Sequence, residues 1–136
     1  MKKLLAGALA LCLVLGIVPV SVFTAFAEEH TETIDLGTLQ QDRELSESGT
    51  YTLTGTGTHR VTVKGGVQAT IILQNASIET ELSPLTLGDT ANVMLILKDG
   101  TDNQFTATNA AGILVPETAT LTIDTLIDEQ GTGKLT

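Results

Sequence analysis

Two patterns of apolar residues divide the chain. The first is an apolar run over residues 4–22, which follows two lysines and precedes Ala25-Phe26-Ala27. A basic end, an apolar segment and small residues before a cleavage point, in this order, are typical of a secretory signal peptide. A retained membrane anchor is less favoured, because Gly16 and Pro19 interrupt the run and no basic cluster follows it. We therefore assign residues 1–27 to a signal peptide and expect a secreted or cell-surface protein with no membrane span after cleavage.

The second pattern begins at Gly49, where short segments of alternating apolar and polar residues are separated by Gly, Asn and Asp. Three such rows superpose without gaps at offsets of 24 and then 28 residues. The rows are VTVKGGVQATIILQN from Val61, LTLGDTANVMLILKD from Leu85 and ILVPETATLTIDTL from Ile113. A further apolar residue precedes each row, so each unit holds three short strands. These preceding residues are Leu53, Ile78 and Phe105.

A repeat of this length with three strands and no helical pattern indicates a solenoid. We predict an all-β fold, a short three-sided right-handed parallel β-helix of about three rungs over residues 49–136. Equivalent residues of successive rungs would lie about 4.8 Å apart, so that apolar columns become buried stripes. An antiparallel sandwich of short strands remains the alternative. The final GTGKLT matches the start of another rung, so we expect a fragment whose C-terminal end meets further rungs or another domain.

The segment between these patterns, residues 28–48, is acidic with scattered apolar positions. It is either a solvated N-terminal leader or a cap that lays Ile34, Leu36 or Leu39 over the first rung.

Composition and charge exclude some classes of function. The net charge of −9 falls to −11 when the signal peptide removes Lys2 and Lys3, because all sixteen acids follow residue 27. This balance argues against nucleic-acid binding and against an electrostatic membrane anchor. Cys12, the single cysteine, lies in the signal peptide, so no disulfide holds the exported part. The 22 threonines after residue 27 favour strands.

The repeats also resemble a known group of proteins. The runs SGTYTLTGTG, IILQNASIE, VMLILKDGTDN and GILVPETATLTI are similar to those of secreted bacterial, mainly clostridial, proteins with a carbohydrate-binding domain. The resemblance covers roughly residues 48–136. It implies a right-handed parallel β-helix like that of polysaccharide lyases, and a link with calcium and acidic plant polysaccharides.

Sugar binding would need polar groups, because aromatic platforms are scarce. We expect Tyr51 to point outward, in a column with Asn103 and Gly133, so that no aromatic ladder forms. Ligand-binding candidates are Tyr51, Asn75 and Asn103, and binding would depend on hydroxyls, amides or a bridging cation.

Calcium is the cation that oxygen ligands in such an acidic domain would select. The candidate ligands lie in turns that would stack on one another: Asp99, Asp102, Asp128 and Glu129. The alternative is that these residues simply favour turns.

An apolar stripe is expected on the outer surface. Alternation places Ile72, Met94 and Ile96 outward on neighbouring strands, which suggests a covered or docking surface. Either residues of the 28–48 segment pack over the stripe, or another domain or copy does.

No catalytic arrangement is recognisable, since neither His30 nor His59 has a nucleophile at a suitable spacing. We therefore expect a non-catalytic carbohydrate-binding module, with calcium-assisted binding of acidic polysaccharide as one form. The alternative is a structural solenoid segment of a larger surface protein or adhesin with no specific sugar ligand.

Overall fold

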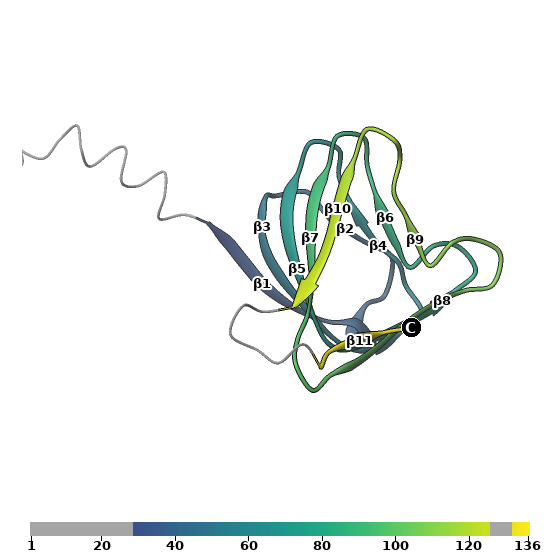
Figure 1. Cartoon of the computed structure of the whole chain (residues 1–136). Helices are drawn as coiled ribbons and strands as arrows, with labels where there is room; N and C mark the ends of the chain where they lie inside the picture. Colours follow the sequence, from purple (N-terminus) through teal and green to yellow (C-terminus); the bar gives the residue numbers. More distant parts are fainter. Residues whose placement is uncertain (1–28, 126–131) are drawn as a thin grey trace, which may run out of the picture.

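Parallel coils stacked on one another make up the fold (Figure 1). The computed structural model describes residues 29–125 and 132–136 of the chain. Apart from one short 3₁₀ turn, η1 (Leu36–Thr38), its regular elements are strands, and every strand pairing is parallel. The predicted signal peptide, residues 1–27, lies outside the described residues.

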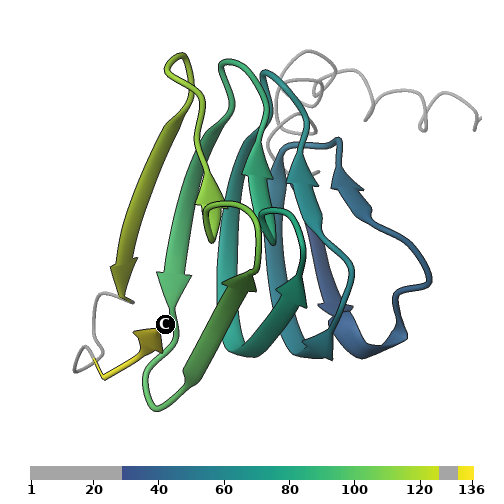
Figure 2. The same ribbon diagram turned by 90° about the vertical axis from the view of Figure 1, so that its right-hand side faces the viewer.

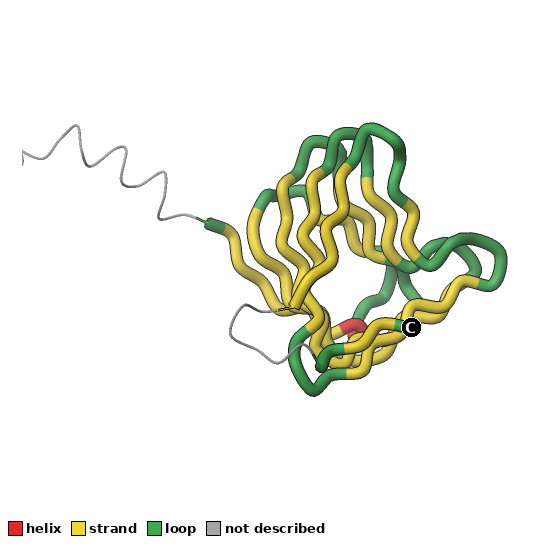
Figure 3. The backbone as a smooth tube through the Cα atoms, in the orientation of Figure 1, coloured by secondary structure: helices red, strands yellow, loops and turns green. Residues whose placement is uncertain are grey.

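The strands form three faces around one core, as Figure 3 shows in cross-section. The first face contains β1 (His30–Asp35), the first part of β3 (Gly49–Gly57), the first part of β5 (Gln68–Thr80), β7 (Asn92–Leu97) and β10 (Thr120–Thr125). The second contains the remaining parts of β3 and β5 with β8 (Asp102–Ala107) and β11 (Lys134–Leu135). The third contains β2 (Arg43–Leu45), β4 (Val61–Val63), β6 (Leu85–Leu87) and β9 (Ile113–Leu114).

Views along and across the coil axis show a right-handed path (Figure 1, Figure 2). The predicted all-β, three-sided parallel β-helix is therefore confirmed, and the antiparallel sandwich is excluded. The superposed rows also share register, since Val61 pairs with Leu85 and Leu85 with Ile113. Ala69 and Val93 pair in the same way on the first face.

One expected column is wrong. Leu53 pairs with Leu73 on the first face, whereas Ile78 pairs with Phe105 on the second. The sequence alignment assumed separate strands, but β3 and β5 each continue through a corner and contribute to two faces. Leu53 therefore lies before the corner and Ile78 after it.

Residues 29–48 of the acidic segment form a coil of their own. β1 pairs with β3 over six residues, and β2 pairs with β4. Ile34 and Leu36 are buried in the core, where Ile34 lies in the same column as Leu53. The solenoid thus extends to His30, and the fold shows no division at residue 48.

The corner between the first and second faces requires unusual backbone. Gly55, Asn75 and Gly100 have positive φ angles of 81°, 57° and 76°, a region that glycine and asparagine tolerate best. Asn75 is the extra residue of a β-bulge, because Thr54 pairs with Gln74 but Gly55 pairs with Ala76. The bulge turns β5 from one face to the next.

Asn103, next to this corner, ties three coils together. Its Oδ1 accepts a 2.8 Å hydrogen bond from the Ala76 N–H of the preceding coil. Its Nδ2 donates to Thr101 Oγ1 at 3.1 Å and to the Lys134 carbonyl of the following coil at 2.9 Å. The side chain is completely buried, so these backbone groups have little access to water as a substitute.

We expect Asn103→Ala to lower the free energy of unfolding by about 2–4 kcal/mol, because it leaves buried backbone groups without partners. Urea unfolding followed by circular dichroism measures the change. Gln104→Ala, at the exposed neighbouring position of β8, is the matched control and should change stability by less than about 0.5 kcal/mol. Equal effects of both substitutions would contradict the role given to Asn103.

In the first coil, ionised side chains occupy inward positions that are apolar in later coils. Glu32 lies in the column of Ile71, and Arg43 in the column of Val61. Arg43 Nη1 and Nη2 donate to the two carboxylate oxygens of Glu32 at 2.9 and 2.6 Å. His30 Nε2 lies 3.3 Å from Glu32 and its Nδ1 lies 3.1 Å from Glu47. The His30 ring also packs on Tyr51, with centroids 5.2 Å apart. Together these side chains cover the N-terminal end of the core.

This ion pair predicts a loss of stability in acid. The hydrogen bonds from Arg43 hold the pKa of Glu32 below its usual value of 4.5. The charged carboxylate therefore stabilises the fold above pH 4.5, and the stabilisation disappears as the pH falls through the lower pKa of the folded state. The urea midpoint should fall further between about pH 7 and about pH 3 in the unmodified protein than in Glu32→Gln.

Glu44→Gln, which changes an exposed acid of β2, serves as the control and should keep the original pH dependence. An unchanged pH dependence in Glu32→Gln would show that the pair does not contribute.

Candidate functional site

Tyr51 does not lie on the outer surface, so the predicted orientation is wrong. Its column contains Glu32, Ile71 and Leu95, and its side chain is 1% exposed. Burial raises the pKa of its phenol, and the hydroxyl donates a 2.6 Å hydrogen bond to the Glu47 carbonyl. The expected alignment with Asn103 fails because Asn103 belongs to the second face. Tyr51 is thus unavailable as a platform for a sugar ring.

The two asparagines predicted to bind a ligand hold the corner instead. Asn103 is fully buried and has partners at both ends of its amide. Asn75 is exposed, and its Oδ1 accepts a 3.0 Å hydrogen bond from the Asp102 N–H of the next coil. Both side chains therefore have a structural explanation.

The acidic residues proposed for calcium are only partly described. Asp99 is half-buried, and its Oδ1 accepts a 2.8 Å hydrogen bond from the Thr132 N–H. Asp102 is exposed, whereas Asp128 and Glu129 lie outside the described residues. Within residues 29–125 and 132–136, no group of three or more His, Cys, Asp or Glu side chains is placed to hold a metal ion. Calcium binding stays a prediction.

The outward stripe on the first face is uneven in exposure. Ile72 pairs with Ile96, and Met94 lies two residues before Ile96 on β7. Met94 is 42% exposed, Ile72 is half-buried and Ile96 is 8% exposed. Ile34 and Leu36 lie inside the core, and Leu39 packs against the same core. The prediction that one of these three residues covers the outward stripe is therefore wrong.

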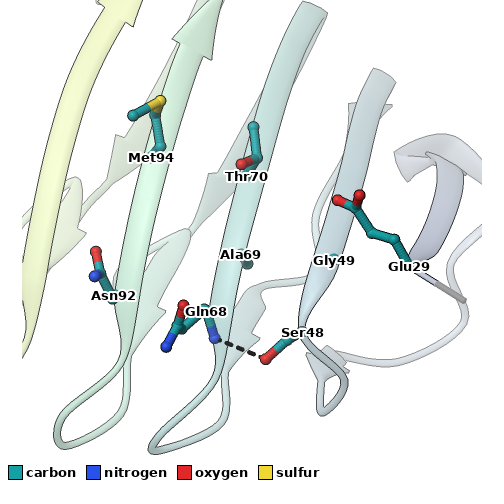
Figure 4. Close-up of a pocket in the computed structure, with 8 residues that line it drawn as sticks. All are labelled: Glu29, Ser48, Gly49, Gln68, Ala69, Thr70, Asn92 and Met94. Atoms are coloured by element: carbon teal, nitrogen blue, oxygen red, sulfur yellow. Dashed lines mark hydrogen bonds between the residues drawn. The ribbon is translucent and has the colours of Figure 1, made fainter. Parts of the chain in front are cut away.

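An open groove lies beside this stripe, on the outside of the first face (Figure 4). Its volume is about 440 Å³. The lining comes from the start of β3, β5 and β7 and from the residues before β1 and β3. It consists of Glu29, Ser48, Gly49, Gln68, Ala69, Thr70, Asn92 and Met94.

Polar side chains repeat from strand to strand in the groove. Gln68 and Asn92 pair on β5 and β7, and both are exposed. Their side-chain amides make no hydrogen bond to other described residues, and in Figure 4 they lie side by side. Thr50 and Thr70 pair in the next outward column, which continues to Met94. The groove thus offers free amides and hydroxyls next to an apolar surface.

Local contacts order one end of the groove and set its charge. The Ser48 hydroxyl accepts a 3.0 Å hydrogen bond from the Gln68 N–H. Thr50 Oγ1 donates a 3.2 Å hydrogen bond to Glu29 Oε2. Glu29 is an ionisable group of the lining, and no Lys or Arg is among these lining residues. The groove therefore does not attract anions.

Sequence reasoning missed this groove because its lining residues form no recognisable motif, although the aligned rows already place Gln68 opposite Asn92. The outward column Thr31, Thr50, Thr70, Met94 and Thr122 runs across five strands. This column holds four threonines and one methionine, which are far apart in the sequence and become neighbours through the pairing of the strands.

No protein-family model matches the chain, and the searches of curated proteins and of solved structures found no significant match. The resemblance to clostridial carbohydrate-binding proteins therefore stays a prediction. Over residues 29–125 and 132–136 there is no helix of sufficient length and apolar character to cross a membrane.

Proposed function

We propose that the chain is a secreted, non-catalytic carbohydrate-binding module and that the groove over β3, β5 and β7 holds the glycan. The observation that carries this proposal is the pair of free amides, Gln68 and Asn92, beside the hydroxyl of Thr70 and the apolar side chain of Met94. Sugars present hydroxyls at their edges and apolar C–H groups on their ring faces. Amides and hydroxyls can donate and accept hydrogen bonds to the former, and Met94 can contact the latter.

The stacking of coils also suits a polymer. Equivalent outward side chains repeat about every 4.8 Å along the coil axis, because this is the spacing of neighbouring strands. A linear glycan lying across the strands would meet a similar set of polar groups at each coil. Polysaccharide is therefore a better ligand for this surface than a free monosaccharide.

Charge favours an uncharged glycan over an acidic one. Glu29 lies in the groove, the lining has no Lys or Arg, and the chain carries a net charge of −9. An acidic polysaccharide would meet like charge there and would need a bridging cation such as calcium.

Immobilised neutral and acidic polysaccharides, each with calcium and with a chelator, test this proposal. We expect binding to a neutral polymer that the chelator does not change. Calcium-dependent binding to an acidic polymer would instead support the calcium-assisted form. Absence of binding to every polymer in both conditions would overturn the proposal and favour a structural solenoid segment.

Substitutions then locate the site. We expect Asn92→Ala and Gln68→Ala each to weaken binding about tenfold, the equivalent of one lost hydrogen bond of about 1.4 kcal/mol. Gln104→Ala removes a similar amide from the second face and should leave affinity unchanged. Equal losses in all three variants, measured by affinity electrophoresis, would place binding elsewhere.

A further inference from the structure

The two nitrogens of the His30 ring face two different carboxylates. Nε2 lies 3.3 Å from Glu32 Oε1 on the same strand, and Nδ1 lies 3.1 Å from Glu47 Oε1 in the segment before β3. A neutral imidazole carries one N–H and can donate to only one of these carboxylates, whereas the protonated ring donates to both. Both contacts are therefore hydrogen bonds only when His30 is protonated.

The charges around the ring favour the added proton. Glu32 and Glu47 bring two negative charges to it, and Arg43, which is bound to Glu32, brings one positive charge. Tyr51 packs on the ring from β3 and stays uncharged, because burial raises the pKa of its phenol. A positive charge on His30 thus makes this group of side chains neutral as a whole, and opposite charges at such distances stabilise the protonated form.

The contacts of His30 lead to the groove on the first face. Glu29 precedes His30 and Ser48 follows Glu47, and both Glu29 and Ser48 line the groove. The Ser48 hydroxyl in turn accepts the hydrogen bond from the Gln68 N–H, which is drawn in Figure 4. A continuous path of contacts and chain therefore connects the histidine ring with one of the two amides assigned to the glycan.

We propose that protonation of His30 closes a clasp between residues 29–30 and residues 47–48, and that this clasp fixes the wall of the groove at the first coil. The ordinary charge change of histidine falls between about pH 5 and about pH 8. The clasp therefore stabilises the wall in mild acid, and the stabilisation is lost as the pH rises. Its effect on binding rests on the proposed glycan function, since a wall that is already ordered lowers the cost of holding a polysaccharide.

Glu47 is the contact that opens when the ring loses its proton. One ring nitrogen then presents a lone pair to a carboxylate, and the carboxylate that can move away leaves. The side chain of Glu47 is 69% exposed and can turn to water, whereas Glu32 is held by two hydrogen bonds from Arg43. Release of Glu47 frees the segment that carries Ser48.

Nuclear magnetic resonance of the protein without glycan tests the clasp itself. We expect the ring signals of His30 and the backbone amide signals of Ser48 and Gln68 to shift with a common midpoint between about pH 8 and about pH 5. In Glu47→Gln the ring should still titrate, but the two amide signals should no longer follow it. His59→Gln removes the other histidine of the chain and, as the matched control, should keep the common shift. Amide signals that do not follow the His30 ring, or that still follow it in Glu47→Gln, would overturn the clasp.

Binding measurements test the effect of the clasp on the groove. Affinity electrophoresis with the polysaccharide retained in the binding test above should show about threefold tighter binding at about pH 5.5 than at about pH 8, as for one partly exposed ion pair. His30→Gln should bind equally at both pH values, and His59→Gln should keep the difference. Equal affinity of the unmodified protein at both pH values would overturn the control of the groove. If no polysaccharide binds at either pH, the glycan function fails, and the amide signals alone decide whether the clasp exists.

Discussion

The parallel, in-register stacking of inward side chains is the constraint on which the rest of this structure depends. Each coil has no core of its own, because a single turn of three short strands cannot bury an apolar face. Residues such as Ile71 and Leu95 are fully buried only because each lies above and below a similar side chain. The close approach of coils also restricts the backbone. A Cβ on Gly49 would overlap the His30 carbonyl oxygen, so this position accepts only glycine without a shift of the first coil.

This constraint determines where function can be located. Inward positions are occupied by the core, and corner residues such as Asn75 and Asn103 hold neighbouring coils together through backbone hydrogen bonds. Outward positions remain, and the three faces differ in what they offer. The third face has four strands of three residues or fewer. The first face has five strands, and its strands are longer. Among the described residues, the first face is therefore the surface with the longest continuous set of outward columns.

The sequence was sufficient to predict the β-helix because the repeat and the alternation both reflect the stacking itself. The rows from Val61, Leu85 and Ile113 align in the structure as they align in the sequence. The first coil was not recognised, since His30, Glu32 and Arg43 replace the apolar residues by which a repeat is detected. The outward expectation for Tyr51 conflicts with alternation itself, because Tyr51 lies two residues before the inward Leu53 on β3 and therefore points to the same side of the strand. The groove was not predicted although the rows already align Gln68 with Asn92, because two amides in register are not a motif for any one chemistry.

Stacking also determines how the proposed glycan site would act. The outward columns of the first face continue from coil to coil, so a polysaccharide lying across the strands would contact side chains of several coils at once. A sugar unit that left its contacts would be held near the surface by the units still bound, and would rebind at a high effective concentration. A groove whose lining has no aromatic side chain could in this way hold a polymer more tightly than a single sugar.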